Sequence, residues 1–152
     1  MIVIAHNIRS LHNVGAIFRS ADAFGVERLY LTGYTAAPPR KEIAKTALGS
    51  EDRVVWEKES DVMKVVADLQ AKGVHVLALE TSADAIPLPE ARKKFDPART
   101  ALILGNEVSG LEKELLSACE GTVQIPMPGK KRSLNVSVAS GIALFAFCSE
   151  NG

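Results

Sequence analysis

The chain has 152 residues and a hydrophobic content of 47%, which is enough for one domain with a substantial core that needs neither metals nor disulfides. Its basic and acidic residues number 18 each, so the whole molecule has no net field to attract a polyanion, and any nucleic-acid binding must come from local patches. No apolar stretch approaches the ~20 residues that span a bilayer, and the start shows no charged leader. We therefore expect a cytoplasmic protein with no membrane partner.

The two cysteines, Cys119 and Cys148, stand in partly apolar, helical surroundings. They form no Cys-x-x-Cys pair, and no histidine stands at ligand spacing from either of them. We expect buried free thiols and no metal site.

Strand and helix patterns alternate along the chain. Strands are predicted over residues 2–5, 26–32, 53–56, 74–79, 101–104 and 123–125. Helices are predicted from about residue 13 to 24 with Gly25 as C-terminal cap, over 60–72 and 112–119, from about 134 to 148, and in a short stretch around 40–45. The proline-rich segment 84–100 is expected to be an extended excursion over the surface. These repeated units predict an α/β fold with a parallel sheet, helices on both faces, and ligands at the carboxyl ends of the strands.

The first polar segment follows the first predicted strand and opens a helix. Arg19 in that helix could grip a phosphate or stabilise charge that develops on a ribose oxygen, or it could simply form a salt bridge with Asp22, three residues on. Asn13 has the properties of a helix cap. Gly15 lowers helix propensity in the first turn, which indicates that another backbone or a ligand comes close.

The second segment, around Gly105, Glu107 and Gly110, leaves a buried strand and enters a helix. The lysine and hydroxyl of a Walker motif are missing, and no Gly-x-Gly-x-x-Gly fingerprint occurs, which argues against a triphosphatase and a dinucleotide enzyme. What remains is a turn with room for a flat ligand over Gly105 and a carboxylate, Glu107, that anchors a ligand or orders neighbouring loops. A glycine-rich turn without further function is the alternative.

The third segment, residues 125–141, combines a rigid loop, three consecutive cations and a helix start. Lys130, Lys131 and Arg132 are placed to receive a nucleic-acid phosphate, although short basic runs are mostly solvated loops. Ser133 and Asn135 could cap the following helix or hold a substrate hydroxyl.

Together, the three segments resemble the ordered motifs of the SpoU or TrmH-like branch of the SPOUT RNA methyltransferases. Asn13 with Arg19 matches the first motif, Gly105-Asn106-Glu107 with Gly110-Leu111 the second, and Ile125-Pro126-Met127 with Ser133-Leu134-Asn135-Val136-Ser137 the third. The resemblance covers nearly the whole chain. It implies an α/β fold with a deep C-terminal trefoil knot, a kind of connection that is rare and that no hydrophobic period predicts.

The resemblance also implies a site for S-adenosylmethionine and transfer of its methyl group to a ribose 2′-hydroxyl of RNA. The implied cofactor-binding residues are Leu79, Thr81, Gly105, Asn106, Ile125, Met127, Ser133 and Leu134. The implied catalytic set is Arg19, Asn13, Ser133, Asn135 and Glu107. In this set Arg19 orients the hydroxyl and stabilises the developing alkoxide, because a guanidinium is effectively always protonated, and Glu107 organises the motif loops.

Family members work as dimers with the active site near the interface, and the apolar final helix, with Val138, Ile142, Leu144, Phe145 and Phe147, fits either a partner or a purely internal core. We expect one catalytic domain over residues 1–152 without a separate RNA-binding extension. Its candidate RNA contacts are Arg9, His12, Arg40, Lys41, Lys45, Lys130, Lys131 and Arg132. tRNA is favoured over rRNA by analogy alone, and a binding module without turnover or a base-directed methyltransferase are the alternatives.

Overall fold

The computed structural model describes residues 1–149 and shows a parallel sheet between two layers of helices. The strands are β1 (Ile2–His6), β2 (Arg28–Thr32), β3 (Trp56–Glu59), β4 (His75–Leu79), β5 (Ile86–Pro87), β6 (Thr100–Leu104) and β7 (Gly121–Gln124). The helices are α1 (Leu11–Ala23), α2 (Lys41–Ala47), α3 (Ser50–Arg53), α4 (Val62–Ala71), α5 (Leu88–Lys94), η1 (Pro97–Arg99), α6 (Lys113–Ala118) and α7 (Val136–Cys148).

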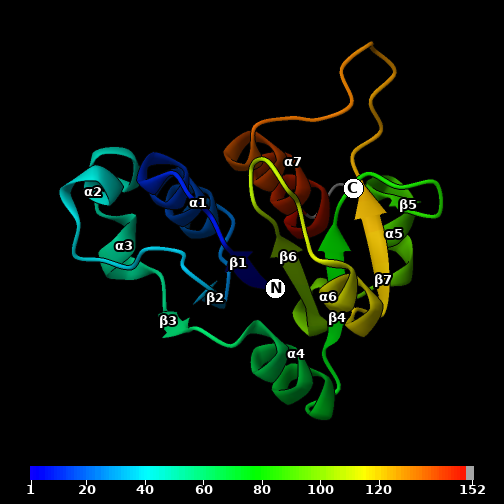
Figure 1. Ribbon diagram of the computed structural model, residues 1–152, viewed down its shortest axis with the longest axis horizontal. Coiled ribbons are helices and arrows are strands. Elements are labelled where there is room, and N and C mark those ends of the chain that lie inside the picture. Colours follow the sequence, from blue (N-terminus) through cyan, green and yellow to red (C-terminus); the bar gives the residue numbers. More distant parts are fainter. Residues whose placement is uncertain (150–152) are drawn as a thin grey trace.

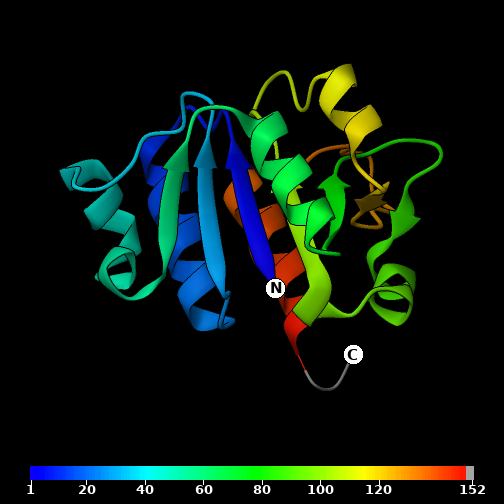
Figure 2. The ribbon, with the colours of Figure 1, turned by 90° about the horizontal axis from the view of Figure 1, so that it is seen from below.

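Within residues 1–149 the sheet has seven strands in the order β3-β2-β1-β6-β4-β7-β5, and every neighbouring pair is parallel. Figure 2 shows the arrowheads of β1, β2 and β3 pointing the same way. The strands therefore present their carboxyl ends along one edge, where the loops that follow β1, β4, β6 and β7 meet. The α/β parallel-sheet prediction is confirmed.

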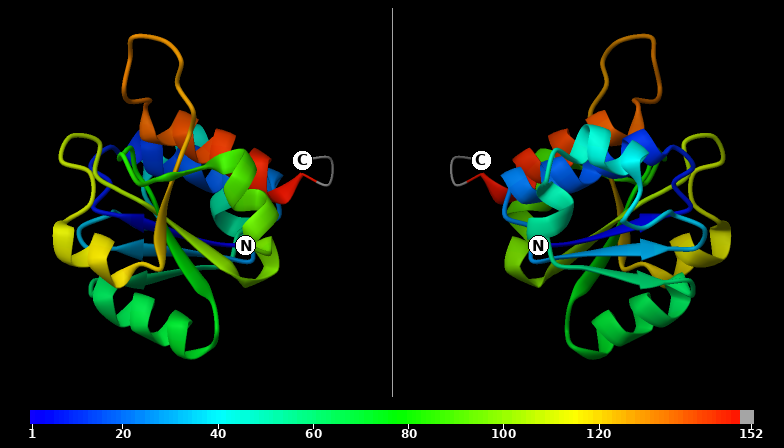
Figure 3. Two further views of the ribbon diagram at one scale, coloured as in Figure 1. Left: turned by 90° about the vertical axis from the view of Figure 1, so that its right-hand side faces the viewer. Right: turned by 90° about the vertical axis from the view of Figure 1, so that its left-hand side faces the viewer.

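Side chains of each central strand alternate between two hydrophobic clusters. On β1, Val3 belongs to the core beneath α1, α5 and α7, whereas Ile2 and Ile4 belong to the core beneath α4 and α6. Figure 3 shows α1 and α7 on one side of the strands and α4 on the other. Because both faces are covered, the central strands β1, β4 and β6 are nearly continuous apolar runs.

One predicted segment is wrong. Residues 84–100 contain a strand, a helix and a 3-10 turn instead of an extended excursion. Pro89 lies in the first turn of α5 and Pro97 begins η1, where a missing backbone N–H costs no hydrogen bond. Leu88 and Phe95 are buried and hold the segment against the sheet.

Several other bounds differ by a few residues. The strand expected at 53–56 is β3, four residues long and starting at Trp56, because residues 50–53 form the short helix α3. The last helix begins at Val136, not near residue 134. Gly25 follows the end of α1 with φ +64°, which confirms the predicted cap. Within residues 1–149 no helix is both long enough and apolar enough to cross a bilayer.

Candidate active site

A pocket opens at the carboxyl ends of β4, β6 and β7, where the chain enters α7. It is lined by Leu79, Glu80, Thr81, Leu104, Gly105, Gln124, Ile125, Met127, Ser133, Leu134, Val136 and Ala139. Figure 1 shows the elements that carry these residues, namely the strands β4, β6 and β7, the projecting loop of residues 125–135 and the helix α7 that follows it. Three segments far apart in sequence therefore build one cavity.

Seven of the eight residues expected to bind a cofactor line this pocket, and Asn106 is the exception. Its side-chain amide donates to the Asn7 carbonyl at 2.9 Å and to the Tyr34 hydroxyl at 2.7 Å. Its carbonyl oxygen accepts from the backbone N–H groups of Val108 and Ser109. Asn106 thus shapes the second-motif turn rather than the pocket wall.

Gly105 is required by a close approach of the chain to itself. A Cβ atom at this position would lie 2.8 Å from Leu111 Cγ and 2.9 Å from the carbonyl carbon of Gly110. Any side chain would push the second-motif turn away from the pocket. The space over Gly105 therefore depends on the packing of this turn.

Glu107 joins the second motif to the first. Its carboxylate accepts hydrogen bonds from the backbone N–H groups of Arg9 (2.9 Å) and Ser10 (3.1 Å) and from the Asn13 side-chain amide (3.0 Å). Burial alone would raise the pKa of Glu107, but these hydrogen bonds outweigh it and the net pKa lies below its ordinary value. These contacts hold the first-motif loop against the second-motif turn.

Asn13 does not cap α1. The N-cap is Ser10, whose side chain accepts from the Asn13 backbone N–H. Asn13 lies in the first turn of the helix, and its side chain is engaged by Glu107 instead. Gly15 lies where α1 and α2 touch, since a Cβ there would overlap Thr46 Oγ1 and the Ile43 carbonyl oxygen. The close backbone approach predicted at this glycine is confirmed.

Arg19 is exposed on α1, and the salt bridge to Asp22 considered as an alternative does not form. Asp22 is occupied by Arg53, whose Nη2 lies 2.6 Å from Oδ2, and by the Ser50 hydroxyl at 2.9 Å. Within residues 1–149 the structure shows no hydrogen bond or ion pair of the Arg19 side chain, and α1 contributes no lining residue to the pocket. The guanidinium is therefore available to a molecule outside this chain.

The third motif divides its residues between two tasks. Ser133 lines the pocket, whereas Asn135 caps α7 by accepting from the Ser137 N–H at 2.9 Å. The Thr81 hydroxyl donates to the Arg132 carbonyl at 3.4 Å, which ties this loop to the end of β4.

The eight candidate RNA contacts are all exposed, and six of them form two groups. Arg40, Lys41 and Lys45 belong to α2 and the residue before it, and Lys130–Arg132 belong to the loop between β7 and α7. In Figure 1 these two groups lie on opposite sides of α1. Arg9 and His12 are exposed between them, at and before the start of α1.

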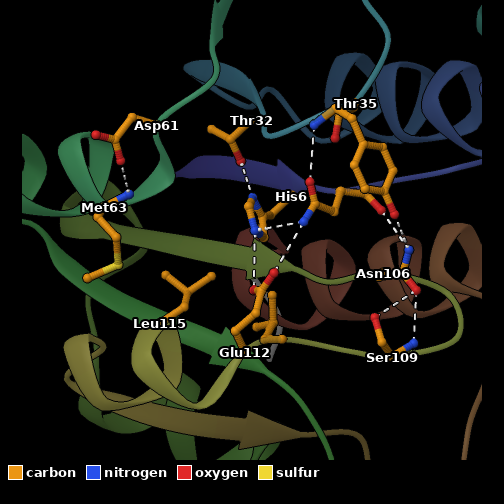
Figure 4. A network of polar contacts seen from close by, with 12 residues as sticks. His6, Thr32, Thr35, Asp61, Met63, Asn106, Ser109, Glu112 and Leu115 are labelled. Carbon is orange, nitrogen blue, oxygen red and sulfur yellow. Dashed lines mark hydrogen bonds and ion pairs between the residues drawn. The ribbon is translucent and has the colours of Figure 1, made fainter.

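The sequence patterns missed a polar network at the end of β1 (Figure 4). The His6 side chain is buried, with 5% of its surface exposed. Its Nδ1 atom lies 3.0 Å from Thr32 Oγ1, and its Nε2 atom lies 3.3 Å from Glu112 Oε2. Asn7 donates to Glu112 at 3.2 Å and accepts from the Tyr34 N–H at 3.1 Å. The network fastens the first-motif loop to the residue before α6. Its only local signal in the sequence is a histidine directly after the apolar run of residues 2–5.

The pocket also contains residues that the sequence patterns did not identify, namely Glu80, Leu104, Gln124, Val136 and Ala139. Glu80 directly follows β4, next to the predicted Thr81, so its place at the carboxyl edge was open to prediction.

The chain is similar to several RNA-modifying enzymes. It is 34% identical over 145 residues to the 23S rRNA (guanosine-2'-O-)-methyltransferase RlmB of Xanthomonas axonopodis pv. citri, covering 95% of this chain and 57% of that one. It is also 34% identical over 146 residues to the tRNA (guanosine(18)-2'-O)-methyltransferase of Aquifex aeolicus, covering 95% of this chain and 67% of that one. The chain thus spans little more than half the length of the first of these relatives.

Solved structures show the same fold. The A. aeolicus TrmH/SpoU tRNA modifying enzyme matches with a TM-score of 0.83 at 32% identity, covering 96% of this chain and 72% of that one. The AdoMet-bound rRNA methyltransferase from Sinorhizobium meliloti matches with a TM-score of 0.85 at 29% identity, covering 96% and 54%. The model of the SpoU rRNA Methylase family matches residues 1–145. With the three motifs gathered at one edge of a SPOUT-type parallel sheet, the chain belongs to the SpoU rRNA Methylase family.

Proposed function

We propose that this chain is the catalytic domain of an S-adenosylmethionine-dependent RNA ribose 2′-O-methyltransferase. The observation that carries the proposal is the pocket, because residues of the second and third motifs and the end of β4 line it together. Two relatives that are 34% identical to the chain over 95% of its length are named as guanosine 2′-O-methyltransferases. The trefoil knot implied by this resemblance stays a prediction.

The pocket fits the cofactor chemically. Leu79, Leu104, Ile125 and Leu134 provide apolar walls for a flat base, and Gly105 leaves a side-chain-free surface between them. When bound, S-adenosylmethionine supplies an activated methyl group on a sulfonium centre. The protein then has to hold the acceptor hydroxyl in line with that group and remove its proton.

Arg19 is our candidate for activating the hydroxyl. Its guanidinium offers N–H donors and a positive charge, so it orients the 2′-oxygen and stabilises the developing alkoxide, while the proton leaves through a neighbouring phosphate or water. Asn13, held by Glu107, keeps the first-motif loop in place beside it. Ser133, at the pocket wall, completes the arrangement by holding the ribose.

We also propose that the active site needs two copies of the chain. Arg19 does not line the pocket of its own chain. In this proposal the pocket therefore receives Arg19 from a partner chain. The last helix offers a surface for that partner, since Val138, Ile142 and Phe145 are 51%, 39% and 61% exposed on one face while Leu144 and Phe147 are buried on the other. A homodimer covers this apolar face and brings Arg19 of one chain to the other's pocket.

RNA recognition in this scheme uses the two basic groups on either side of α1. Phosphate contacts from these lysines and arginines give binding that weakens steeply with salt. The preference for tRNA over rRNA stays a prediction, because relatives of both kinds match the chain.

The test is transfer of label from methyl-labelled S-adenosylmethionine to total tRNA and rRNA, followed by nucleoside mass spectrometry. We expect a 2′-O-methyl nucleoside; a methylated base or no label in RNA contradicts the proposal. Arg19→Ala should abolish transfer and leave cofactor affinity in place. Lys72→Ala, an exposed cation at the end of α4, is the control for loss of one positive charge. Unchanged turnover in Arg19→Ala refutes its role.

A further inference from the structure

Glu80 is the only ionisable side chain that lines the pocket in the described part of the chain. It follows β4 directly, at the carboxyl edge of the sheet. One carboxylate oxygen, Oε2, accepts from the backbone N–H of Leu111 at 3.3 Å. This contact fixes the carboxylate against the second-motif turn.

The charge of Glu80 is not neutralised within residues 1–149. The structure shows no ion pair to this carboxylate, and the remaining polar lining residues are the uncharged Thr81, Gln124 and Ser133. The Leu111 N–H is a single neutral donor, and it reaches only one of the two oxygens. A half-buried carboxylate with so little compensation favours a positively charged ligand.

Gly110 shows that the carboxylate position is built into the turn. Its φ is +67°, and a Cβ there would lie 2.6 Å from Glu80 Oε2. Only glycine both adopts this backbone conformation and leaves room for the carboxylate. The second-motif turn and Glu80 are thus mutually fitted.

We propose that Glu80 makes the pocket selective for charge, so that it holds the cationic cofactor more tightly than the demethylated product. This inference rests on the proposed function. S-adenosylmethionine carries a sulfonium, an ammonium and a carboxylate, for a net charge of plus one. Transfer breaks the sulfur–methyl bond, the electron pair stays on sulfur, and the resulting thioether has a net charge of zero. The reaction therefore removes the charge that Glu80 attracts, and product release is favoured.

The experiment is calorimetric titration of the protein with three ligands. S-adenosylmethionine and sinefungin, whose amine replaces the sulfonium, are cationic at the reacting centre, and S-adenosylhomocysteine is neutral there. Glu80→Gln keeps an oxygen for the Leu111 N–H but removes the charge. We expect it to weaken binding of both cationic ligands about tenfold, equivalent to about 1.4 kcal/mol, and to leave S-adenosylhomocysteine unchanged.

Two variants serve as controls. Glu80→Asp keeps the charge and should keep the preference for cationic ligands. Glu27→Gln removes the same charge from an exposed residue before β2, at the amino edge of the sheet, and should change none of the three affinities. Circular dichroism and thermal midpoints report whether each variant is folded.

If Glu80→Gln lowers the affinity for all three ligands equally, the inference is overturned. The carboxylate would then bind the ammonium group that all three ligands share, or it would only stabilise the fold. No change with any ligand overturns it as well. The unmutated protein gives a second measurement if Glu80→Gln does not fold: raising the salt concentration should reduce the preference for the cationic ligands, and a salt-independent preference contradicts the proposal. Failure of the proposed function is distinct, since it is observed as a methylated base or as no label in RNA, whereas this inference is tested by ligand affinities alone.

Discussion

The Glu107 carboxylate accepts a 3.0 Å hydrogen bond from the side-chain amide of Asn13, 94 residues earlier in the chain. The same carboxylate also accepts from the backbone N–H groups of Arg9 and Ser10. One side chain of the second motif therefore sets the conformation of the first-motif loop and of the start of α1, the helix that carries Arg19.

Glu107→Gln should lower the free energy of unfolding at neutral pH by about 1 kcal/mol, because one acceptor oxygen is replaced by a donor that faces other donors. The pKa of Glu107 is lowered in the folded protein from its ordinary 4.5, so its contribution is present above pH 4.5 and is lost as the pH falls through the folded value. Urea unfolding between pH 3 and 7 measures both effects. Glu114→Gln, on the exposed side of α6, is the matched control. The same acid dependence in Glu107→Gln as in the unmutated protein contradicts this prediction.

His6 predicts a second pH dependence, closer to neutrality than that of Glu107. Burial lowers the pKa of His6 from its ordinary 6.5, and this outweighs Glu112, which raises it. The unfolded chain then binds a proton more readily than the folded chain, so stability is fully present above pH 6.5 and decreases as the pH falls toward the folded value.

Thermal midpoints between pH 5 and 8 test this. His6→Gln should flatten the decrease below pH 6.5, whereas His12→Gln, which changes an exposed histidine on α1, should keep it. Parallel pH profiles for His6→Gln and the unmutated protein would show that another group is responsible.

The α/β order and most of the pocket residues were predicted from different features of the sequence. Apolar runs such as residues 101–104 identify buried strands locally, and the motif resemblance placed Ile125 and Leu134 at the pocket. The alternative of a helix cap at Asn13 is wrong, because local spacing fits a cap while the partner of its side chain, Glu107, is distant in sequence. Segment 84–100 was misassigned because proline disfavours helix interiors but suits their first turn. The position of Glu80 after a predicted strand indicates the carboxyl edge of the sheet, but only the fold shows that it lines a cavity there.

Gly15→Ala should destabilise the protein by about 1 to 3 kcal/mol, although alanine is the better helix former, because its Cβ would overlap the Ile43 carbonyl oxygen and Thr46 where α1 meets α2. Gly141→Ala in α7 is the matched comparison. Its Cβ would meet nothing nearer than Ser20 Oγ at 3.6 Å, so it should gain about 1 kcal/mol from helix propensity. Chemical unfolding of both variants measures these changes in the free energy of unfolding. A stable Gly15→Ala would mean that α2 moves away from α1 at little cost.

Phe145→Glu should convert the proposed dimer to a monomer. Phe145 is 61% exposed on the same face of α7 as Val138 and Ile142, and its only ring contact within residues 1–149 is edge-on with Phe24. A charge in the middle of an apolar interface is costly. Sedimentation equilibrium should give half the mass of the unmutated protein, while Val55→Glu, at an apolar residue that is 53% exposed beside β3, should leave the mass unchanged. A monomeric unmutated protein contradicts the dimer.

Subunit complementation tests whether Arg19 acts on the partner's pocket. Arg19→Ala keeps an intact pocket, and Ala139→Phe fills the pocket wall of a chain whose Arg19 is intact. Each variant alone should be inactive. After mixing and exchange, half of the dimers contain one chain of each kind, and each of these has one complete site, so activity should return to about a quarter of the unmutated level. If Arg19 instead served the pocket of its own chain, both sites of the mixed dimer would be defective and no activity would return, because neither chain would carry a working arginine and a working pocket together.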